Sequence, residues 1–197
     1  MNRCTVIKER FQESIEVKTN ILKDDRLIQL INDLADAISE SIKNGGKLLI
    51  CGNGGSASDA LHIAGELVGR FQKERKAWPA IVLNADVATM TAISNDYGYD
   101  EIFARQVEAH MTNRDLLLGI STSGNSNNIV RAFVKAKEIG GKTALLSGRE
   151  GGKLKSIADF SVVVPSNVTA RIQESHICIA HILCELVEFQ LVGVTER

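Results

Sequence analysis

The 197 residues include 44% hydrophobic and 24% charged side chains, with a formal net charge of −1. This length suits one domain with a sizeable core, and the near-zero charge without a basic cluster argues against a nucleic-acid partner. The apolar runs are too short to span a bilayer, and the charged N-terminus lacks the apolar segment of a signal peptide. Since the four cysteines form no C-x-x-C pair, we expect a cytoplasmic protein with reduced cysteines and no membrane partner.

The first 45 residues are expected to form helices. Ile7, Phe11 and Ile15 recur every four residues, and a stronger apolar stripe runs through residues 27–42 before the glycine pair at 45–46. Apolar residues at this spacing lie on one helical face, and glycine favours the end of a helix. Two amphipathic helices ahead of the first strand need something to cover, either the sheet of the same chain or a second subunit.

The rest of the chain alternates short apolar runs with helical stretches. The clearest helical stretches cover residues 127–141 and 170–191. Strands that are apolar throughout indicate burial on both faces, as in a parallel sheet covered by helices. We therefore predict an α/β fold, a three-layer α-β-α sandwich whose ligands bind at the carboxyl ends of the strands. Its five parallel strands are expected at residues 47–51, 80–84, 115–120, 142–147 and 159–165.

The loop after the first strand, residues 51–59, reads CGNGGSASD. Its glycines let the backbone approach a ligand closely, and the amides at the start of the next helix favour an anion such as phosphate. Ser56 or Ser58 is expected to cap that helix. The alternative is a tight strand-to-helix turn that holds no ligand. No G-K-[ST] follows the glycines, which excludes a P-loop.

The same loop fits a dinucleotide fingerprint by its spacing. Gly52, Gly54 and Ala57 match the pattern, and Asp86 lies near the place where such a domain holds a ribose. A dinucleotide domain gives no role, however, to the hydroxyl-rich loop at residues 119–128, GISTSGNSNN. The dinucleotide interpretation is therefore the minor alternative.

Four hydroxyl side chains crowd the end of the third strand: Ser121, Thr122, Ser123 and Ser126. Hydroxyls combined with the amides of a helix N-terminus form a site with many hydrogen-bond donors for a phosphate dianion. Serine and asparagine are also common in turns, but four hydroxyls at one strand end favour a phosphate site.

Candidate acid–base and metal-binding residues lie on two helices. His62 and Glu66 are four residues apart on the helix after the glycine loop, so they share a face. Gln173 and His181 share a face of the last helix, whereas Glu174 and His176 point elsewhere and are interpreted as solvated or structural. The N and O donors of His62, Glu66, Gln173 and His181 suit zinc or another divalent ion.

The distance along the last helix limits this grouping. The eight residues from Gln173 to His181 span about 12 Å, a long reach for one metal or one substrate atom. We therefore expect the pocket to lie at a subunit boundary, with one of these side chains supplied by a neighbour.

Four stretches of the chain resemble phosphoheptose isomerases of the sugar-isomerase (SIS) domain family. In chain order they are CGNGGSASDALHIAGELVGRF, AISNDYGYDEIFARQVE, GISTSGNSNNIV and TARIQESHICIAHILCELVE. The resemblance covers essentially the whole chain and implies a single SIS domain, 1–197, with helices used in packing and oligomerisation at 1–45 and the sheet core and C-terminal helix at 46–197. It also implies a homotetramer with active sites near subunit interfaces, and a bacterial cytoplasmic enzyme that supplies heptose to lipopolysaccharide or another surface glycan.

The same resemblance implies roles for particular residues. It places one zinc ion per subunit on His62, Glu66, Gln173 and His181. The expected substrate contacts are Asn53, Gly54, Gly55, Ser56, Glu66, Asn95, Asp96, Ser121, Thr122, Ser123, Ser126 and Gln173.

The implied reaction converts sedoheptulose 7-phosphate to glycero-manno-heptose 7-phosphate through an enediol. Glu66 is assigned as the base at carbon and His181 as the acid and base at oxygen, with zinc either polarising the carbonyl or ordering the helices. The alternative is a tetrameric SIS adaptor of the replication initiator DnaA, which would keep the serine loop but lack the acid–base pair. The motifs leave a pentose or hexose phosphate open as the substrate.

Overall fold

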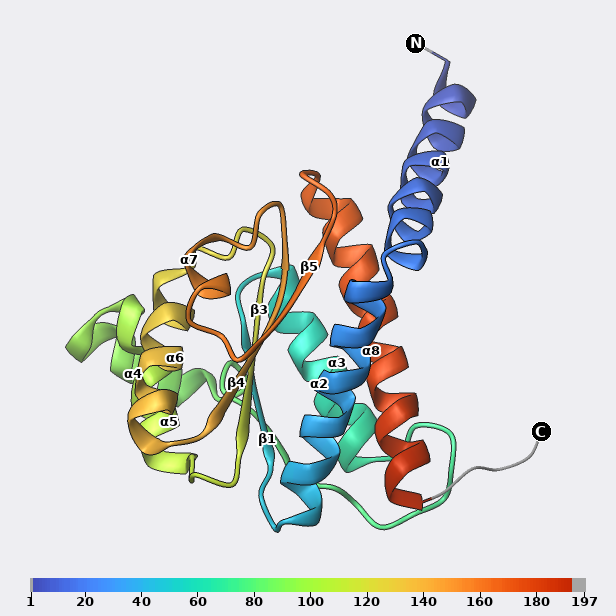
Figure 1. The fold of residues 1–197 in the computed structure, drawn as a ribbon. Helices are drawn as coiled ribbons and strands as arrows, with labels where there is room; N and C mark the ends of the chain where they lie inside the picture. The colour runs from blue at the N-terminus through green and yellow to red at the C-terminus, as the bar shows by residue number, and fades with distance from the viewer. Residues whose placement is uncertain (1, 193–197) are drawn as a thin grey trace.

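A single parallel sheet lies at the centre of the molecule, in a computed structural model that describes residues 2–192 (Figure 1). The predicted bounds of the domain, residues 1 and 197, lie outside the described part. The strand order is β2-β1-β3-β4-β5, and every neighbouring pair is parallel. This arrangement confirms the predicted α/β class and the five-stranded parallel sheet. The strands are Leu48–Gly52 (β1), Ala80–Val82 (β2), Leu116–Ser121 (β3), Lys142–Gly148 (β4) and Phe160–Val164 (β5).

Helices cover both faces of the sheet. In Figure 1, α2, α3 and α8 lie on one side, and α4 to α7 lie on the other. The helices are Arg3–Leu22 (α1), Asp25–Lys43 (α2), Gly55–Val68 (α3), Val87–Tyr97 (α4), Ala104–His110 (α5), Asn127–Ile139 (α6), Gly152–Lys155 (α7) and Thr169–Val192 (α8), with a 3-10 turn at Tyr99–Glu101 (η1).

The two faces of each central strand enter different apolar clusters. Leu48 and Ile50 of β1 pack in the cluster formed with α2, α3 and α8. Leu49 and Cys51 pack in the cluster formed with α5 and α6. Successive side chains of a strand point to opposite faces, so a strand covered on both sides is apolar at every position.

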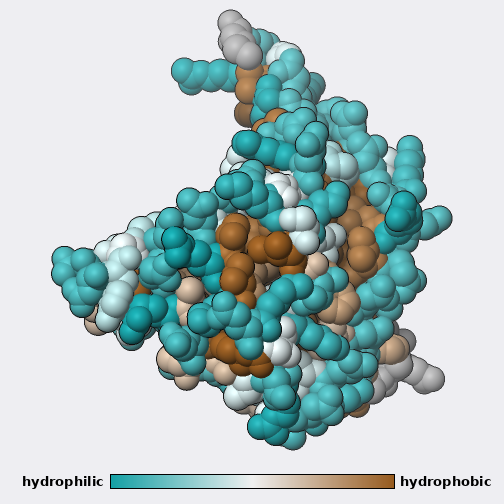
Figure 2. All heavy atoms as spheres, turned by 60° about the vertical axis from the view of Figure 1, so that its left-hand side comes forward, coloured by the Kyte–Doolittle hydropathy of each residue, from teal (hydrophilic) through white to brown (hydrophobic). Residues whose placement is uncertain are grey.

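The two N-terminal helices bury their stripes differently. On α2, Leu27 and Ile31 are buried and join the core with α8. On α1, Ile7, Phe11 and Ile15 are 56%, 69% and 56% exposed. Figure 1 shows α1 projecting beyond the rest of the chain, and Figure 2 shows apolar atoms on this projection as well as in a patch at the middle of one face. The apolar stripe of α1 therefore does not cover the sheet of its own chain.

Strand β2 ends earlier than the predicted residues 80–84. The backbone N–H of Leu83 still bonds to the Ile50 carbonyl at 2.9 Å. The N–H of Gly52, however, donates to the side-chain Oδ1 of Asn84 at 3.2 Å. Because a side chain takes the place of the next ladder bond, the strand ends at Val82.

Helix α8 passes a length and composition test for a membrane span. The sequence predicts a helix at residues 170–191, with apolar runs too short for a span. Ile179 and Leu183 of α8 are buried in the cluster with α2 and α3. Core helices of globular proteins pass the same test, and the packing of α8 identifies it as one of these.

Candidate active site

Helices α3 and α8 run side by side and bring together residues far apart in the chain (Figure 1). At their N-terminal ends, Gly55 lies so close to the amide of Gln173 that a Cβ on the glycine would overlap it. Further along, His62 contacts His181. The two helices therefore align the N-terminal part of α8 with the start of α3.

The turn from β1 into α3 is built from glycine. Gly54 has φ +56°, in the region that favours glycine. The side chain of Asn84 fastens the turn, since its Oδ1 accepts from the Gly52 N–H and its Nδ2 donates to the Ala57 carbonyl at 3.2 Å. Helix α3 therefore starts directly at the carboxyl edge of the sheet.

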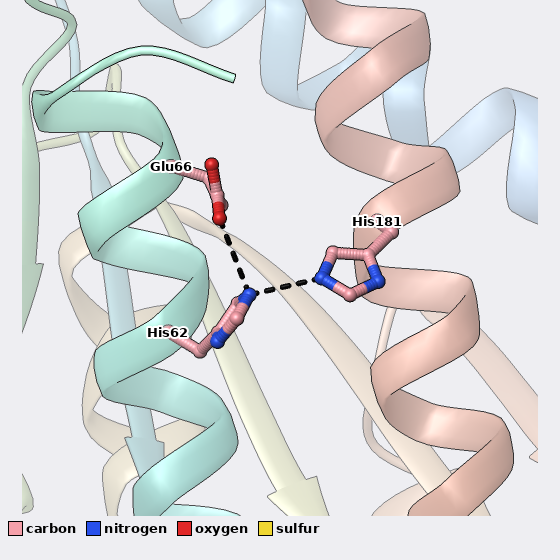
Figure 3. A group of neighbouring side chains, drawn as sticks. All are labelled: His62, Glu66 and His181. Atoms are coloured by element: carbon pink, nitrogen blue, oxygen red, sulfur yellow. Dashed lines mark hydrogen bonds and ion pairs between the residues drawn. The ribbon is translucent and has the colours of Figure 1, made fainter. Parts of the chain in front are cut away.

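His62, Glu66 and His181 point toward one another across the gap between α3 and α8 (Figure 3). The two Nε2 atoms of His62 and His181 are 2.9 Å apart. His62 Nε2 is also 3.2 Å from Glu66 Oε1. The side chains of His62 and Glu66 are 44% and 25% exposed, so the group can be reached from solvent.

This group has the chemistry of a cation site. One candidate ligand atom from each side chain lies within 4.8 Å of the others. His62 Nε2 carries at most one hydrogen, which cannot form a full hydrogen bond to both His181 Nε2 and Glu66 Oε1. A divalent cation accepts electron pairs from all three, and two imidazoles with a carboxylate form a known zinc-ligand set. The residues therefore fit zinc.

Two neighbours shape this group from the side of His181. The ring of Phe71 stacks on the imidazole of His181, with centroids 6.0 Å apart and planes at 26°. The thiol of Cys184 lies three residues further along α8, and burial raises its pKa to about 12. This thiol is protonated at neutral pH, so it does not compete with the histidines as a thiolate ligand.

Asp59 lies one helical turn before His62. Burial raises the pKa of this carboxyl, although the nearby His62 acts in the opposite direction. Among the described residues its buried Oδ2 has no hydrogen-bond partner.

The serine loop after β3 is folded around Ser121, which is 4% exposed. Its Oγ accepts from the Gly124 N–H at 3.2 Å and lies 3.0 Å from Ser126 Oγ. Gly124 has φ +66°, and a Cβ there would overlap the Gly151 carbonyl, so only glycine fits. Thr122 and Ser123, by contrast, are partly exposed at the edge of the sheet.

Side-chain amides join the serine loop to the glycine loop. Asn53 and Asn128 form two reciprocal bonds, each from Nδ2 to Oδ1 at 3.0 Å. The Tyr99 hydroxyl donates to Asn53 Oδ1 at 2.8 Å. The loops after β1 and β3 therefore form one continuous surface at the carboxyl edge.

The expected capping by serine is wrong. The N-cap residue of helix α3 is Gly54, which has no side chain to make a capping bond, so neither Ser56 nor Ser58 has this role. Ser126, before α6, also makes no capping bond, since its hydroxyl is next to that of Ser121. Two helix N-termini without side-chain caps thus lie at the same edge, an arrangement that favours an anion.

Three acidic or amide residues lie apart from the His62 group. Asn95 and Asp96 are exposed on α4, across the sheet from α8, and the Asn95 Nδ2 donates to Asp96 Oδ1 at 2.9 Å. Asp86, considered for a ribose, caps α4 instead. Hydrogen bonds from Thr89 to its side chain lower the pKa of Asp86.

Comparisons with known proteins agree on one family. A family model described as SIS domain matches residues 11–148. Phosphoheptose isomerases of Helicobacter pylori strain P12 and Clostridium acetobutylicum are 51% and 50% identical over 181 and 187 residues, which is 92% and 95% of this chain and 90% and 95% of theirs. The solved structure of a phosphoheptose isomerase from Francisella tularensis matches with a TM-score of 0.91 and 40% identity, covering 95% of this chain and 98% of that one. This chain belongs to the SIS-domain phosphoheptose isomerase family.

Within this family's fold, the chain brings together part of the predicted site. His62, Glu66 and His181 meet in one chain, so neither member of the acid–base pair needs to come from a neighbour. Gln173, predicted as a fourth ligand, lies instead against Gly55. Its role as a ligand stays a prediction, as do the substrate contacts.

The sequence interpretation missed three residues that shape the carboxyl edge of the sheet. Asn84, Tyr99 and Asn128 each hold the glycine loop or Asn53 in place. Asn84 is the last residue of the strand predicted at 80–84, and Asn128 is the last residue of the serine-rich loop, so both lie at the strand ends that marked their neighbours as candidates. Tyr99 gave no such signal, because its partner Asn53 is distant in the chain.

His176 is the buried histidine of α8. It is 0% exposed, and its Nε2 donates to the Ser147 carbonyl at 3.0 Å. Burial is the main cause that lowers the pKa of this imidazole. The prediction that His176 is structural and lies away from the site agrees with this position.

Proposed function

We propose that this chain is an aldose–ketose isomerase that converts D-sedoheptulose 7-phosphate to D-glycero-D-manno-heptose 7-phosphate. The names of the relatives and their identity of about 50% support this activity. The observation that carries it is the meeting of Glu66 with His62 and His181 at a solvent-accessible place beside the carboxyl edge. The adaptor alternative has no support, since the relatives above are named as enzymes and the acid–base pair is intact.

In the proposed reaction, two side chains move protons. Glu66 removes the proton from the carbon next to the carbonyl, which gives an enediol, and later returns a proton to the neighbouring carbon. His181 exchanges protons with the two substrate oxygens. The 2.9 Å between the Nε2 atoms of His62 and His181 supports this role, because it places His181 in the same group as Glu66, which also contacts His62 (Figure 3).

The phosphate is proposed to bind at the serine loop. Uncapped N-termini of α3 and α6 and the partly exposed hydroxyls of Thr122 and Ser123 support an anion there. The remaining proposed substrate contacts are Asn53, Gly54, Gly55, Ser56, Glu66, Asn95, Asp96, Ser121, Ser126 and Gln173.

We propose one zinc ion per subunit, held by His62, Glu66 and His181, with Gln173 as the further ligand. When bound, zinc supplies Lewis-acid polarisation of the substrate carbonyl or fixes the two helices to each other. Glu66 and His181 would then each use one atom for the metal and another for proton transfer: the two carboxylate oxygens of Glu66 and the two ring nitrogens of His181 would have different tasks.

We propose that the protein forms a homotetramer in the cytoplasm. Its product is proposed to supply heptose for a surface glycan such as lipopolysaccharide. The exposed stripe of Ile7, Phe11 and Ile15 on α1 supports a subunit contact, since an apolar stripe of this length needs cover. We propose one SIS domain for 1–197, although the family model matches 11–148.

Incubation with sedoheptulose 7-phosphate, with and without a chelator, tests the activity by product analysis. The aldose is expected in the untreated sample. Glu66→Gln and His181→Gln should each fold and lose about 10²–10⁴-fold in turnover, the usual contribution of a general acid or base. A near-normal rate in either variant removes that residue from the mechanism, and no aldose under any condition rejects the isomerase.

A further inference from the structure

A buried ion pair joins α8 to the loop that follows α3. Arg75 lies in the segment between α3 and β2, and Glu188 lies on α8. The side chains are each 3% exposed, and Arg75 Nε is 3.2 Å from Glu188 Oε1. The guanidinium also lies over the ring of Trp78, 3.6 Å from its centroid.

The guanidinium of Arg75 reaches the C-terminal end of α3. Its Nη2 donates to the Glu66 carbonyl at 2.8 Å, and its Nη1 donates to the Leu67 carbonyl at 2.9 Å. Carbonyls in the last turn of a helix lack partners within the helix, so a fixed cation there satisfies and holds them. One of these carbonyls belongs to Glu66 itself.

The carboxylate of Glu188 holds the same loop from the α8 side. Its Oε2 accepts the backbone N–H groups of Gln72 and Lys73 at 2.9 and 3.0 Å. Glu188 follows His181 by seven residues, two helical turns, so both side chains lie on the face of α8 that looks toward α3. One face of α8 thus carries His181 and the attachment point of the opposing helix.

We infer that Arg75 and Glu188 are positioning residues that set the distance between the α3 residues His62 and Glu66 and the α8 residue His181. The inference rests on the proposed isomerase and its metal group, and concerns what keeps that group assembled. Arginine suits the position because its planar fork serves the Glu188 carboxylate and two carbonyls at once, which lysine cannot do.

The decisive variant is the double substitution Arg75→Met with Glu188→Met. Removing one partner leaves a buried charge unpaired, whereas replacing both by apolar side chains often preserves stability. The double variant leaves no unpaired charge, so it should still fold. Its Tm should fall, because two helix-end carbonyls and two backbone N–H groups lose their side-chain partners. Its zinc dissociation constant should rise about 10–100-fold, as for residues that support metal ligands. Its kcat should fall while KM changes less than about threefold, because the phosphate loop lies at the other end of α3.

Two further variants separate positioning from mere stability. Arg75→Lys keeps the positive charge beside Glu188 but lacks the planar guanidinium that also reaches the two carbonyls. Like the double variant, it should raise the zinc dissociation constant. It decides the question if the double variant does not fold. Lys47→Met breaks a different ion pair, Lys47–Asp115, 2.7 Å long, whose residues directly precede β1 and β3. This control should lower Tm and leave zinc affinity and kcat unchanged.

A metal-free readout keeps this inference distinct from the proposed function. The chain has four histidines, so imidazole nitrogen spectra of histidine-labelled protein resolve His62 and His181. In the Arg75 variants their signals should move toward those of isolated imidazole, while His176 stays unchanged. A parent that binds no zinc and forms no aldose rejects the proposed function alone. The positioning role is overturned if the Arg75 variants fold and give the same imidazole spectra as the parent. Where the parent binds zinc and turns over substrate, unchanged zinc affinity and kcat are part of the same refuting result.

Discussion

Replacing Asn128 with alanine tests whether the glycine and serine loops depend on each other. Asn128 is 2% exposed. It forms both amide bonds with Asn53 at 3.0 Å, and its Oδ1 also accepts the Ile129 N–H at 3.0 Å. Alanine removes all three interactions without adding bulk.

The expected cost follows from which groups lose their last partner. The Ile129 N–H keeps the Ser126 carbonyl at 3.1 Å. Asn53 Oδ1 keeps the hydrogen bond from the Tyr99 hydroxyl at 2.8 Å, so only Asn53 Nδ2 loses the bond that it donates to Asn128. An unpaired buried group costs about 1–3 kcal/mol, and for the partly buried amide of Asn53 we take about 2 kcal/mol as the upper value. For a chain of this length, about 2 kcal/mol lowers Tm by roughly 4–8 °C.

Calorimetry and kinetics check this prediction together. Tm of Asn128→Ala should fall by the stated amount, and KM for sedoheptulose 7-phosphate should rise about tenfold, since about 1.4 kcal/mol of lost phosphate binding corresponds to that factor. The control is Asn32→Ala on α2, which removes one bond to Asp36 of 3.2 Å and should cost only about 0.2–0.5 kcal/mol. Equal Tm losses in the two variants, or an unchanged KM in Asn128→Ala, would refute the reasoning.

Three further outcomes are expected. Gly55→Ala should displace the amide of Gln173, which its Cβ would overlap, and lower kcat/KM at least tenfold with little loss of Tm, as kinetics and calorimetry can measure. Burial lowers the pKa of the His176 imidazole. As the pH drops below about 6.5, the unfolded chain therefore takes up a proton at this residue before the folded chain does, and stability falls. Between pH 7 and 5, Tm should fall less steeply in His176→Gln than in the parent, and parallel curves would contradict this. Ile7→Ser with Phe11→Ser replaces exposed side chains, so light scattering should detect smaller assemblies while circular dichroism stays native, and an unchanged mass would remove α1 from the contact.

The strands could be predicted from sequence because burial on both faces leaves a continuous apolar run. Leu49 and Ile50 show the reason, since neighbours in one strand enter opposite clusters. The predicted strand at 80–84 is too long, because apolar character continues through Leu83. The pairing ends where the Gly52 N–H donates to the side-chain Oδ1 of Asn84. A bond of this kind leaves no trace in hydrophobic periodicity.

The site was predictable where it is local. His62 and Glu66 share a helical face at a spacing that can be read directly. His181 is 119 positions away from His62, and α8 is apolar on most faces, so periodicity alone did not establish which of its histidines faces α3. The reciprocal bonds of Asn53 and Asn128, 75 positions apart, depend on strand order, which the sequence interpretation did not specify.

Helix α3 is fastened at both ends, by Asn84 at its first turns and by Arg75 at its last. The length of α3 therefore sets the distance between the proposed phosphate site at the carboxyl edge and the residues proposed to transfer protons. At 1.5 Å per residue, the seven positions from Gly55 to His62 measure about 10 Å. Adding or removing one residue would turn His62 by about 100° away from His181, so in this architecture the reach of the pocket can change only in steps of whole helical turns.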